Sequence, residues 1–342
     1  MRRAFALLLS LFALLLPCRA AYDGVTLTEK TVETHGIERT VYLLTVDPSR
    51  AELLLATPGD DEDNDGGDGH GASLLSMAEA AESADRHIVA AVNGDFYKTS
   101  SDGAASFAPY AALGVMVKNG RILSEGQRAL GAAFFGITKD GTAMIGSAEA
   151  GGEWDEVKDT LVTAIGGELL LIRHGESNLP DLRWRTDSYI LADRYGGAGR
   201  ALDDDGNVFS DAVSLSYHPR TAIGVRADGT VVICAASIGY STAGFSIIEL
   251  TDILLEAGCV EAMNLDGGPS TQLCYDGGEG LSQLVSRGIS GRIGDGLLVC
   301  VSENAENDGG RSSDTRIRLV AVSAMALAVL TVTRRRSRRS GK

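Results

Sequence analysis

Three short segments of the chain carry polar side chains where an ordinary turn does not require them. Asn93 and Asp95 follow one apolar run, and Arg220 opens a second. Asp266 follows a third apolar run and precedes Gly267. Carboxylates at strand ends, an arginine fork and a glycine-rich turn with exposed backbone N–H groups suit an anionic or sugar-phosphate ligand. Each segment alone also fits a plain turn or a surface ion pair, so the prediction depends on all three meeting at one site.

Short strands joined by glycine turns must position these residues. Asn-Gly and Asp-Gly dipeptides between apolar runs are strong signals for β-hairpins. The sequence contains three such patterns, over residues 114–123, 134–145 and 221–234. A further pair of strands is predicted over 40–46 and 51–56, joined around Asp47 and Pro48.

Two helices are predicted, and each leads into a strand. The helices cover residues 73–86, with Ser73 as N-cap, and 247–257, ending before Gly258. The strands that follow them cover 87–92 and 259–265. Hairpins together with a few helices predict the α+β class: mixed, largely antiparallel sheets with packed helices, in one domain over residues 22–301.

Both ends of the chain have the composition of targeting segments. Residues 1–20 carry arginines followed by an apolar run, which is typical of a secretory signal peptide. Residues 317–333 are largely apolar and residues 334–342 are strongly basic, a pattern that predicts a transmembrane helix with a cytoplasmic tail. With a polar stalk over 302–316, the domain is expected to be exported and held at the cell surface by this single C-terminal helix.

Composition excludes some classes of partner. The chain has 46 acidic and 31 basic residues, and its formal net charge is −15. Because many of the bases gather at the two ends, a nucleic-acid partner is not expected. The histidines are scattered and no CxxC pair occurs, so neither a metal site nor a cofactor is predicted. The acidic, glycine-rich stretch over 59–71 is interpreted as a solvated loop rather than a calcium site.

Four cysteines lie in the predicted domain. They are Cys234, Cys259, Cys274 and Cys300. An even number of cysteines on an exported chain predicts two disulfides, and three connectivities are possible. Buried free thiols are the alternative.

The three segments belong to a longer series of motifs that resembles the phosphodiester glycosidase family. The series comprises residues 93–97, 113–120, 135–141, 219–224, 264–271 and 292–299, in that order. The resemblance implies hydrolysis of a sugar-1-phosphodiester, with a glycan or sugar phosphate as the substrate. Where the family pattern has Asp-Gly-Arg, however, this chain reads Ser237-Ile238-Gly239, and Pro269 replaces a glycine. These departures favour an alternative function, a glycan-binding or cell-envelope-binding module with little or no catalysis.

The motifs and the resemblance together predict the site residues. The predicted catalytic residues are Asp266, Asp95 and Asn93. The predicted substrate-binding residues come from the same segments and from the last motif of the series: Arg220, Thr221, His218, Asn264, Gly267, Gly268, Ser270, Thr271 and Arg292.

Overall fold

The computed structural model describes ten stretches of the chain, all within the first of two units, residues 1–303. The stretches are 18–34, 37–58, 71–97, 110–128, 132–179, 201–202, 208–209, 218–236, 244–286 and 291–302. Several predictions fall elsewhere: most of the signal peptide, nearly all of the stalk, the transmembrane helix and the basic tail lie outside the described residues. Among the helices that are described, none has the length and apolar character needed to cross a membrane.

The larger sheet of the described part contains twelve strands. Its main path runs in the order β1 (Cys18–Tyr22), β2 (Val25–Thr34), β3 (Ile37–Val46), β16 (Val231–Ala236), β15 (Arg220–Arg226), β17 (Cys259–Leu265), β11 (Leu161–Arg173), β7 (Val115–Lys118) and β8 (Arg121–Glu125). Beside this path, β9 (Ala132–Thr138) pairs with β11 and with β10 (Ala143–Ser147), and β12 (Glu176–Ser177) pairs with β11. The hairpins β7–β8, β9–β10 and β15–β16 confirm the three predicted from the glycine turns.

A second sheet has five strands, with β6 at its centre. Its order is β19 (Leu281–Ser286), β18 (Gln272–Asp276), β6 (His87–Asn93), β21 (Gly296–Val301) and β4 (Glu52–Ala56). Two short pairs complete the described strands: β20 (Arg292–Ile293) with β5 (Ala72–Ser73), and β13 (Ala201–Leu202) with β14 (Val208–Phe209). The described strand pairs are antiparallel, which confirms the predicted sheet type.

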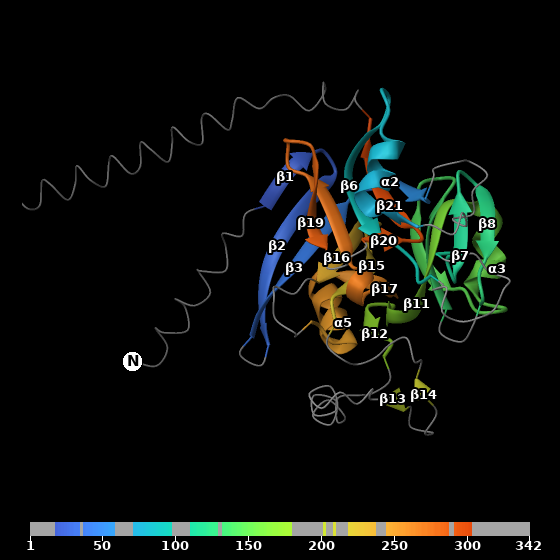
Figure 1. The fold of residues 1–342 in the computed structure, drawn as a ribbon. Helices are drawn as coiled ribbons and strands as arrows, with labels where there is room; N and C mark the ends of the chain where they lie inside the picture. The colour runs from blue at the N-terminus through green and yellow to red at the C-terminus, as the bar shows by residue number, and fades with distance from the viewer. Residues whose placement is uncertain are drawn as a thin grey trace, which may run out of the picture. The chain divides into compact units, whose positions relative to one another are not determined.

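The two sheets pack face to face, and a helix covers the outer face of each. The shared core contains Phe135 and Ile223 from the larger sheet and Val92 and Leu297 from the smaller one. Helix α5 (Ile247–Glu256) packs on the other face of the larger sheet, and α2 (Leu74–Ala81) packs on the smaller one, beside β6 and β21 (Figure 1). Burial of apolar residues in all three interfaces is the main stabilising contribution to this arrangement.

Local capping explains where the two predicted helices begin and end. Ser73 caps α2 by accepting a hydrogen bond from the Ser76 N–H, as predicted. This helix ends at Ala81 rather than at residue 86, because residues 83–86 form a tight backbone-bonded turn. Helix α5 begins with a capping box formed by Ser246 and Glu249, and Gly258 follows it at φ +84°. Glycine adopts this left-handed conformation without steric cost.

The predicted pairing of strands 40–46 and 51–56 is wrong. Both strands exist as β3 and β4, but β3 pairs with β2 and β16, whereas β4 pairs with β21. The turn at Asp47 carries the chain from the larger sheet to the smaller one. Each strand therefore buries its apolar residues against a partner distant in sequence instead of against its neighbour.

The predicted disulfides are also absent from the described residues. Cys234, Cys259, Cys274 and Cys300 are buried free thiols. Strand β15 separates Cys234 from Cys259, and strand β6 separates Cys274 from Cys300. Two strand spacings amount to about 9.5 Å, which is beyond the reach of a disulfide. The alternative interpretation of the four cysteines, buried free thiols, is the one the structure supports.

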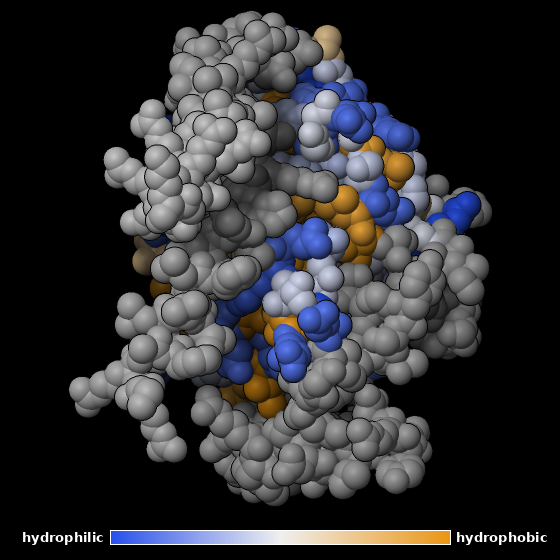
Figure 2. All heavy atoms as spheres, turned by 90° about the vertical axis from the view of Figure 1, so that its left-hand side faces the viewer, coloured by the Kyte–Doolittle hydropathy of each residue, from blue (hydrophilic) through white to orange (hydrophobic). Residues whose placement is uncertain are grey.

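The face of the molecule drawn in Figure 2 is mixed in character. On the face drawn in Figure 2, apolar residues lie between hydrophilic ones and do not form a continuous belt over the described part. Apolar surface distributed in this way is normal for a folded domain and identifies no partner by itself. The functional site must therefore be located from its buried polar groups.

Candidate functional site

The side-chain amide of Asn93 connects the ends of four strands. Its Nδ2 donates to the carbonyl oxygen of Asp266 at 2.7 Å. Its Oδ1 accepts hydrogen bonds from the Thr221 hydroxyl at 2.8 Å and from the Gln272 N–H at 3.0 Å. The residue is 1% exposed, so the structure shows Asn93 as a buried connector that positions Asp266. Whether it also takes part in catalysis stays a prediction.

Asp95 is a buried carboxylate enclosed by backbone. Its Oδ1 accepts from the N–H of Phe96 at 2.7 Å, and its Oδ2 accepts from the N–H of Gly114. A Cβ at Gly166 would lie only 2.7 Å from Oδ2, so this oxygen fits only against a glycine. Burial, followed by the charge of Asp295, raises the pKa of Asp95 well above its usual value, while the two N–H donors lower it.

Asp266 is the partly exposed carboxylate of the site. It follows β17, and its N–H donates to the carbonyl oxygen of Gly94 at 3.0 Å, which fixes the loop across the two sheets. Its Oδ1 accepts from the N–H of Gly267 at 2.8 Å. Burial raises its pKa to about 6, although hydrogen bonds from Ser270 and Gly267 oppose that shift. At pH 7 this carboxyl is mostly ionised and can act on a ligand.

Asp295 is a third carboxylate at this site, and the sequence analysis missed it. It lies between β20 and β21, is 1% exposed, and its Oδ1 accepts from the Asp95 N–H at 2.7 Å. Its pKa is raised to about 7, chiefly by burial; the hydrogen bond from the Asp95 N–H opposes this rise, and the charge of Asp266 adds to it. A signal was present, because Asp295 stands between two glycines before an apolar run, much as Asp95 and Asp266 adjoin glycines.

The N–H groups of Gly267 and Gly268, which the sequence predicts to be exposed, have partners in the structure, and whether these two residues bind substrate stays a prediction. The N–H of Gly267 donates to the carboxylate of Asp266, and the N–H of Gly268 donates to the carbonyl oxygen of Pro219 at 2.8 Å. The next N–H groups, of Ser270 and Thr271, close the short η4 helix (Gly268–Ser270) and its end. The turn uses its donors to hold Asp266 in place, so these N–H groups are not presented to an anion.

Arg220 and Thr221 project from opposite faces of β15. Thr221 reaches Asn93 between the two sheets, whereas the buried Arg220 donates from Nε to the Phe245 carbonyl oxygen at 3.0 Å, on the α5 side. A Cβ at Gly267 would lie 3.8 Å from Arg220 Cδ. The arginine is thus adjacent to the Asp266 loop, although its side chain leaves from the outer face of the sheet.

The remaining predicted binding residues are divided between the site and its surroundings. Ser270 contacts the Tyr97 hydroxyl at 3.3 Å, and that hydroxyl also donates to the Arg292 carbonyl oxygen at 3.3 Å. Arg292 itself is exposed and donates from Nη1 to the Gly71 carbonyl oxygen. His218 is exposed and forms an isolated bridge with Phe245. Among these predicted binding residues, two have a buried oxygen without a hydrogen-bond partner in the described part: Asn264 at Oδ1 and Thr271 at Oγ1.

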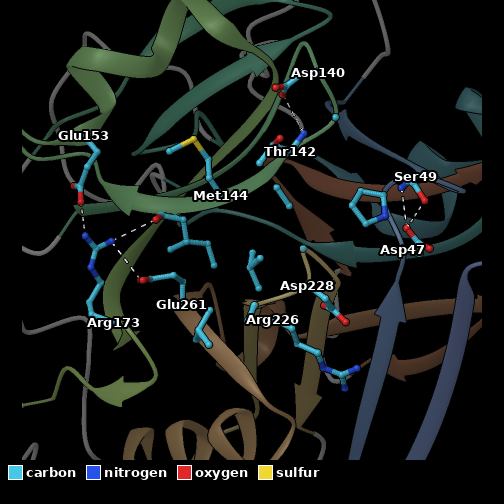
Figure 3. Close-up of a pocket in the computed structure, with 18 residues that line it drawn as sticks. Asp47, Ser49, Asp140, Thr142, Met144, Glu153, Arg173, Arg226, Asp228 and Glu261 are labelled. Atoms are coloured by element: carbon cyan, nitrogen blue, oxygen red, sulfur yellow. Dashed lines mark hydrogen bonds and ion pairs between the residues drawn. The ribbon is translucent and has the colours of Figure 1, made fainter.

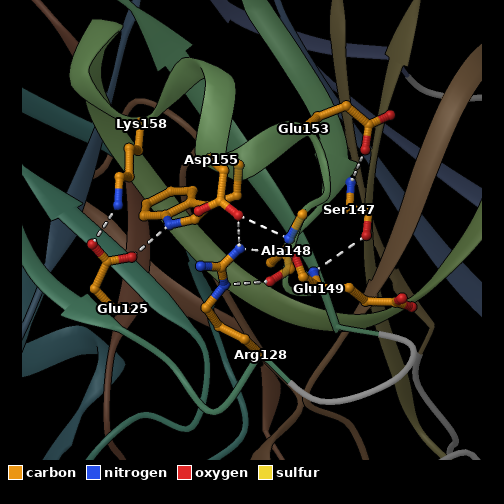
Figure 4. A network of polar contacts seen from close by, with 10 residues as sticks. Glu125, Arg128, Ser147, Ala148, Glu149, Glu153, Asp155 and Lys158 are labelled. Atoms are coloured by element: carbon orange, nitrogen blue, oxygen red, sulfur yellow. Dashed lines mark hydrogen bonds and ion pairs between the residues drawn. The ribbon is translucent and has the colours of Figure 1, made fainter.

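A network of ion pairs supports the loop that contacts Gly114, the donor to Asp95. A Cβ at Gly126 would lie 2.6 Å from the Gly114 carbonyl carbon, so the two backbones are in close contact. Arg128 follows on this loop and pairs with Asp155 at 2.6 Å (Figure 4). Glu125 accepts from Trp154 and from Lys158, both at 2.8 Å. These contacts anchor the loop to α3 (Glu153–Val157) and the 3-10 helix η2 (Lys158–Thr160), and so support the position of Gly114.

A groove in the described part lies apart from these residues. It has a volume of about 1000 Å³ and opens between the turns that carry Asp47, Asp140 and Asp228 (Figure 3). Hydrogen bonds within these turns lower the pKa of all three carboxyls. None of the site residues lines this groove. Within the described ranges, no three His, Cys, Asp or Glu side chains come together in a group that could hold a metal ion.

Comparison with known proteins places these residues in a wider context. The phosphodiester glycosidase family model matches residues 86–300, more than half of the chain. The N-acetylglucosamine-1-phosphodiester alpha-N-acetylglucosaminidase of Homo sapiens is 29% identical over 205 residues, which are 59% of this chain and 34% of that protein. An SPbeta prophage-derived uncharacterized protein of Bacillus subtilis is 42% identical over 62 residues, 18% of this chain and 10% of that protein. The chain spans about a third or less of the length of these relatives.

Solved structures show the same fold. One is the zebrafish N-acetylglucosamine-1-phosphodiester alpha-N-acetylglucosaminidase catalytic domain, auto-inhibited by its pro-peptide. Its TM-score is 0.54 at 19% identity, covering 82% of this chain and 83% of that one. A hypothetical protein from Synechocystis has a TM-score of 0.54 at 17% identity, covering 82% of this chain and 62% of that one. The family resemblance predicted from the motifs is confirmed.

The close approach at Gly94 leads to a test of the site's packing. A Cβ at this position would lie 2.2 Å from Ile165 Cδ1 and 2.3 Å from Asp295 Oδ1. We expect Gly94→Ala to lower the free energy of unfolding by about 1–3 kcal/mol or more, as overpacking of a core does. Urea denaturation measures this, with Gly277→Ala as the matched control because a Cβ at Gly277 meets nothing within 4 Å. Equal stability of the two variants would contradict the tight packing described here.

Proposed function

Because this chain belongs to the phosphodiester glycosidase family, we propose that it is a hydrolase that cleaves a sugar-1-phosphodiester bond in a glycan. The observation that carries the proposal is the carboxyl cluster of Asp95, Asp266 and Asp295 at the meeting of the two sheets. One member, Asp266, is partly exposed and the other two are buried. A bond of the N-acetylglucosamine-1-phosphodiester type, named for the human relative, is the proposed target.

The leaving group of such a bond explains what the site must supply. A phosphomonoester has a second pKa of about 6, so it departs with less proton assistance than a sugar hydroxyl needs. The chief requirement is therefore a carboxylate next to the oxocarbenium-like carbon. Asp266, with a pKa of about 6, is mostly ionised at pH 7 and fits this role. Water supplies the oxygen of the new sugar hydroxyl, and the phosphate oxygen keeps the electrons of the broken bond.

Arg220 is the proposed partner of the phosphate. Its planar guanidinium can bind two phosphate oxygens at once. It stands directly after Pro219, whose carbonyl oxygen accepts the Gly268 N–H, so its backbone is tied to the loop that carries Asp266. We therefore propose that the Asp266 carboxylate stabilises the positive charge that develops at the anomeric carbon. Arg220 binds the phosphate group of the substrate.

We also propose that this enzyme works outside the cytoplasm. The support comes from the apolar runs and basic clusters at the two ends of the chain. In this proposal residues 1–20 direct export, residues 317–333 anchor the domain, and residues 334–342 lie in the cytoplasm. The substrate is then a glycan or cell-envelope component outside the cytoplasm.

A binding module without catalysis is the second candidate function. It is favoured by Ser237-Ile238-Gly239, which replaces the Asp-Gly-Arg of the family pattern; these residues lie outside the described part. A module of this kind would bind the phosphodiester at the same site without cleaving it.

We expect Asp266→Asn to lower kcat at least about a hundredfold, because it removes the charge at the anomeric carbon while keeping the shape of the side chain. Turnover of a chromogenic α-N-acetylglucosamine-1-phosphodiester measures the effect, once each variant is shown to be folded. Asp140→Asn is the matched control, because Asp140 is an exposed aspartate in the β9–β10 turn. Near-parental turnover by Asp266→Asn would reject the assignment. Binding without turnover by the parent would instead support the module.

We expect Arg220→Lys to raise KM for the phosphodiester more than it lowers kcat. Lysine keeps the positive charge but cannot form two parallel hydrogen bonds to phosphate oxygens. Steady-state kinetics beside the parent protein provides the measurement. An unchanged KM in a folded variant would show that Arg220 does not capture the phosphate.

The proposed topology can be tested on intact cells. Protease added from outside should release a soluble fragment that lacks the basic residues 334–342, because the tail is on the other side of the membrane. Mass spectrometry of the fragment identifies its ends. Full protection of the domain from protease would contradict export and surface anchoring.

A further inference from the structure

One oxygen of Asp295 is buried without a hydrogen-bond partner among the described residues. This oxygen is Oδ2, whereas Oδ1 accepts from the Asp95 N–H. The side chain lies against Gly94, where a Cβ would meet both Asp295 Oδ1 and the apolar Ile165. Burying an ionised carboxylate with an unpartnered oxygen is costly, and a neutral carboxylic acid is buried at a much lower cost.

The charged groups that act on Asp295 are themselves carboxyls. Asp266 and Asp95 both interact electrostatically with Asp295. Among the described groups, the contribution that lowers the pKa of Asp295 is the hydrogen bond from the Asp95 N–H. Like charges this close do not all ionise together. Asp266 is partly exposed and accepts a hydrogen bond from the Gly267 N–H, whereas Asp295 is 1% exposed and has an unpartnered oxygen. Asp266 therefore loses its proton first as the pH rises, which agrees with the smaller rise of its pKa.

The same residues are joined through the backbone. Gly94 N–H donates to the Asp295 carbonyl oxygen at 3.2 Å, and the Gly94 carbonyl oxygen accepts from the Asp266 N–H at 3.0 Å. One residue thus holds the loops of both carboxyls. Their separation is set by rigid backbone contacts rather than by flexible side chains, which keeps the electrostatic interaction between them constant.

We propose that Asp295 is a positioning residue that keeps a proton inside the cluster, so that Asp266 carries the negative charge presented to the substrate. The proposal rests on the function proposed above. When Asp295 also ionises at higher pH, a second charge lies beside Asp266 and repels the incoming phosphodiester. Activity should therefore rise with pH as Asp266 ionises and fall as Asp295 ionises.

The test uses Asp295→Asn, which keeps an oxygen to accept the Asp95 N–H but cannot ionise. We expect kcat/KM of the parent to fall roughly tenfold per pH unit above about 7. The Asp295→Asn variant should not show this fall in kcat/KM at high pH, and it should keep the rise at low pH that is due to ionisation of Asp266. The control Asp140→Asn should have the same pH profile as the parent. A uniform loss of activity with both limbs unchanged would show a merely structural role and would overturn the proposal.

A second measurement separates this proposal from the function on which it rests. Because the pKa of Asp295 is raised on folding, the folded state binds more protons between about pH 4 and about 7, and stability falls as the pH rises through that window. Asp295→Asn does not have this fall in stability. The difference between its Tm and that of the parent should therefore increase from about pH 4 to about 7 and stay constant at higher pH. If the parent cleaves no phosphodiester but this trend holds, the proposed function fails and the proton-keeping role stands. A Tm difference independent of pH overturns the role.

A measurement on the parent alone covers the case in which the variant does not fold. Carboxyl ¹³C NMR of aspartate-labelled protein follows each titration directly. We expect the assigned resonances of Asp266 and Asp295 both to have midpoints above about 5, against an ordinary value near 3.9. Finding none or one would overturn the proposal.

Discussion

The structure depends on the side-chain amide of Asn93, which ties the ends of strands from both sheets. This amide accepts hydrogen bonds from the Thr221 hydroxyl and the Gln272 N–H, and it donates one to the Asp266 carbonyl oxygen. The Asn93 side chain is buried from water. An aspartate has the same shape but no donor, and a leucine has neither donor nor acceptor. Either replacement would leave buried polar groups unpaired, at a cost of about 1–3 kcal/mol for each group. These three hydrogen bonds hold the ends of β15, β17 and β18 against the end of β6, beside the three carboxyls.

The carboxyl cluster follows from the constraint that Asn93 imposes. Three acids occupy a region with little water, and each has a different environment: Asp95 is satisfied by backbone N–H groups, Asp295 keeps an unpartnered oxygen, and Asp266 is partly exposed. Their different solvation separates their pKa values. Glycines at 94, 114 and 166 provide the close backbone approach that this crowding needs. The chemistry of the site is therefore a property of backbone packing as much as of the acids.

Short sequence motifs correctly predicted the hairpins and helix ends of the structure. The Asn-Gly and Asp-Gly turns placed three hairpins, and Ser73 and Gly258 marked helix ends, because each depends on a few consecutive residues. The partner of β4, by contrast, is β21, which is distant in sequence and cannot be inferred from a turn. The N–H groups at Gly267 and Gly268 looked free in sequence, but they bind Asp266 and Pro219. Arg292 and Asp295 belong to the same motif, and the glycines on both sides of Asp295 were the only signal in the sequence that distinguished the buried acid from the exposed arginine.

The long sequence separations at the site have a consequence for how the protein folds. The partners of the Asn93 side chain lie 128, 173 and 179 residues away. Contacts that close such large loops carry a high entropic cost and form slowly. The hairpins can assemble early from neighbouring residues, whereas the carboxyl cluster exists only after both sheets have docked. A nascent or partly folded chain thus lacks the assembled carboxyl cluster, which exists only in chains whose folding is complete.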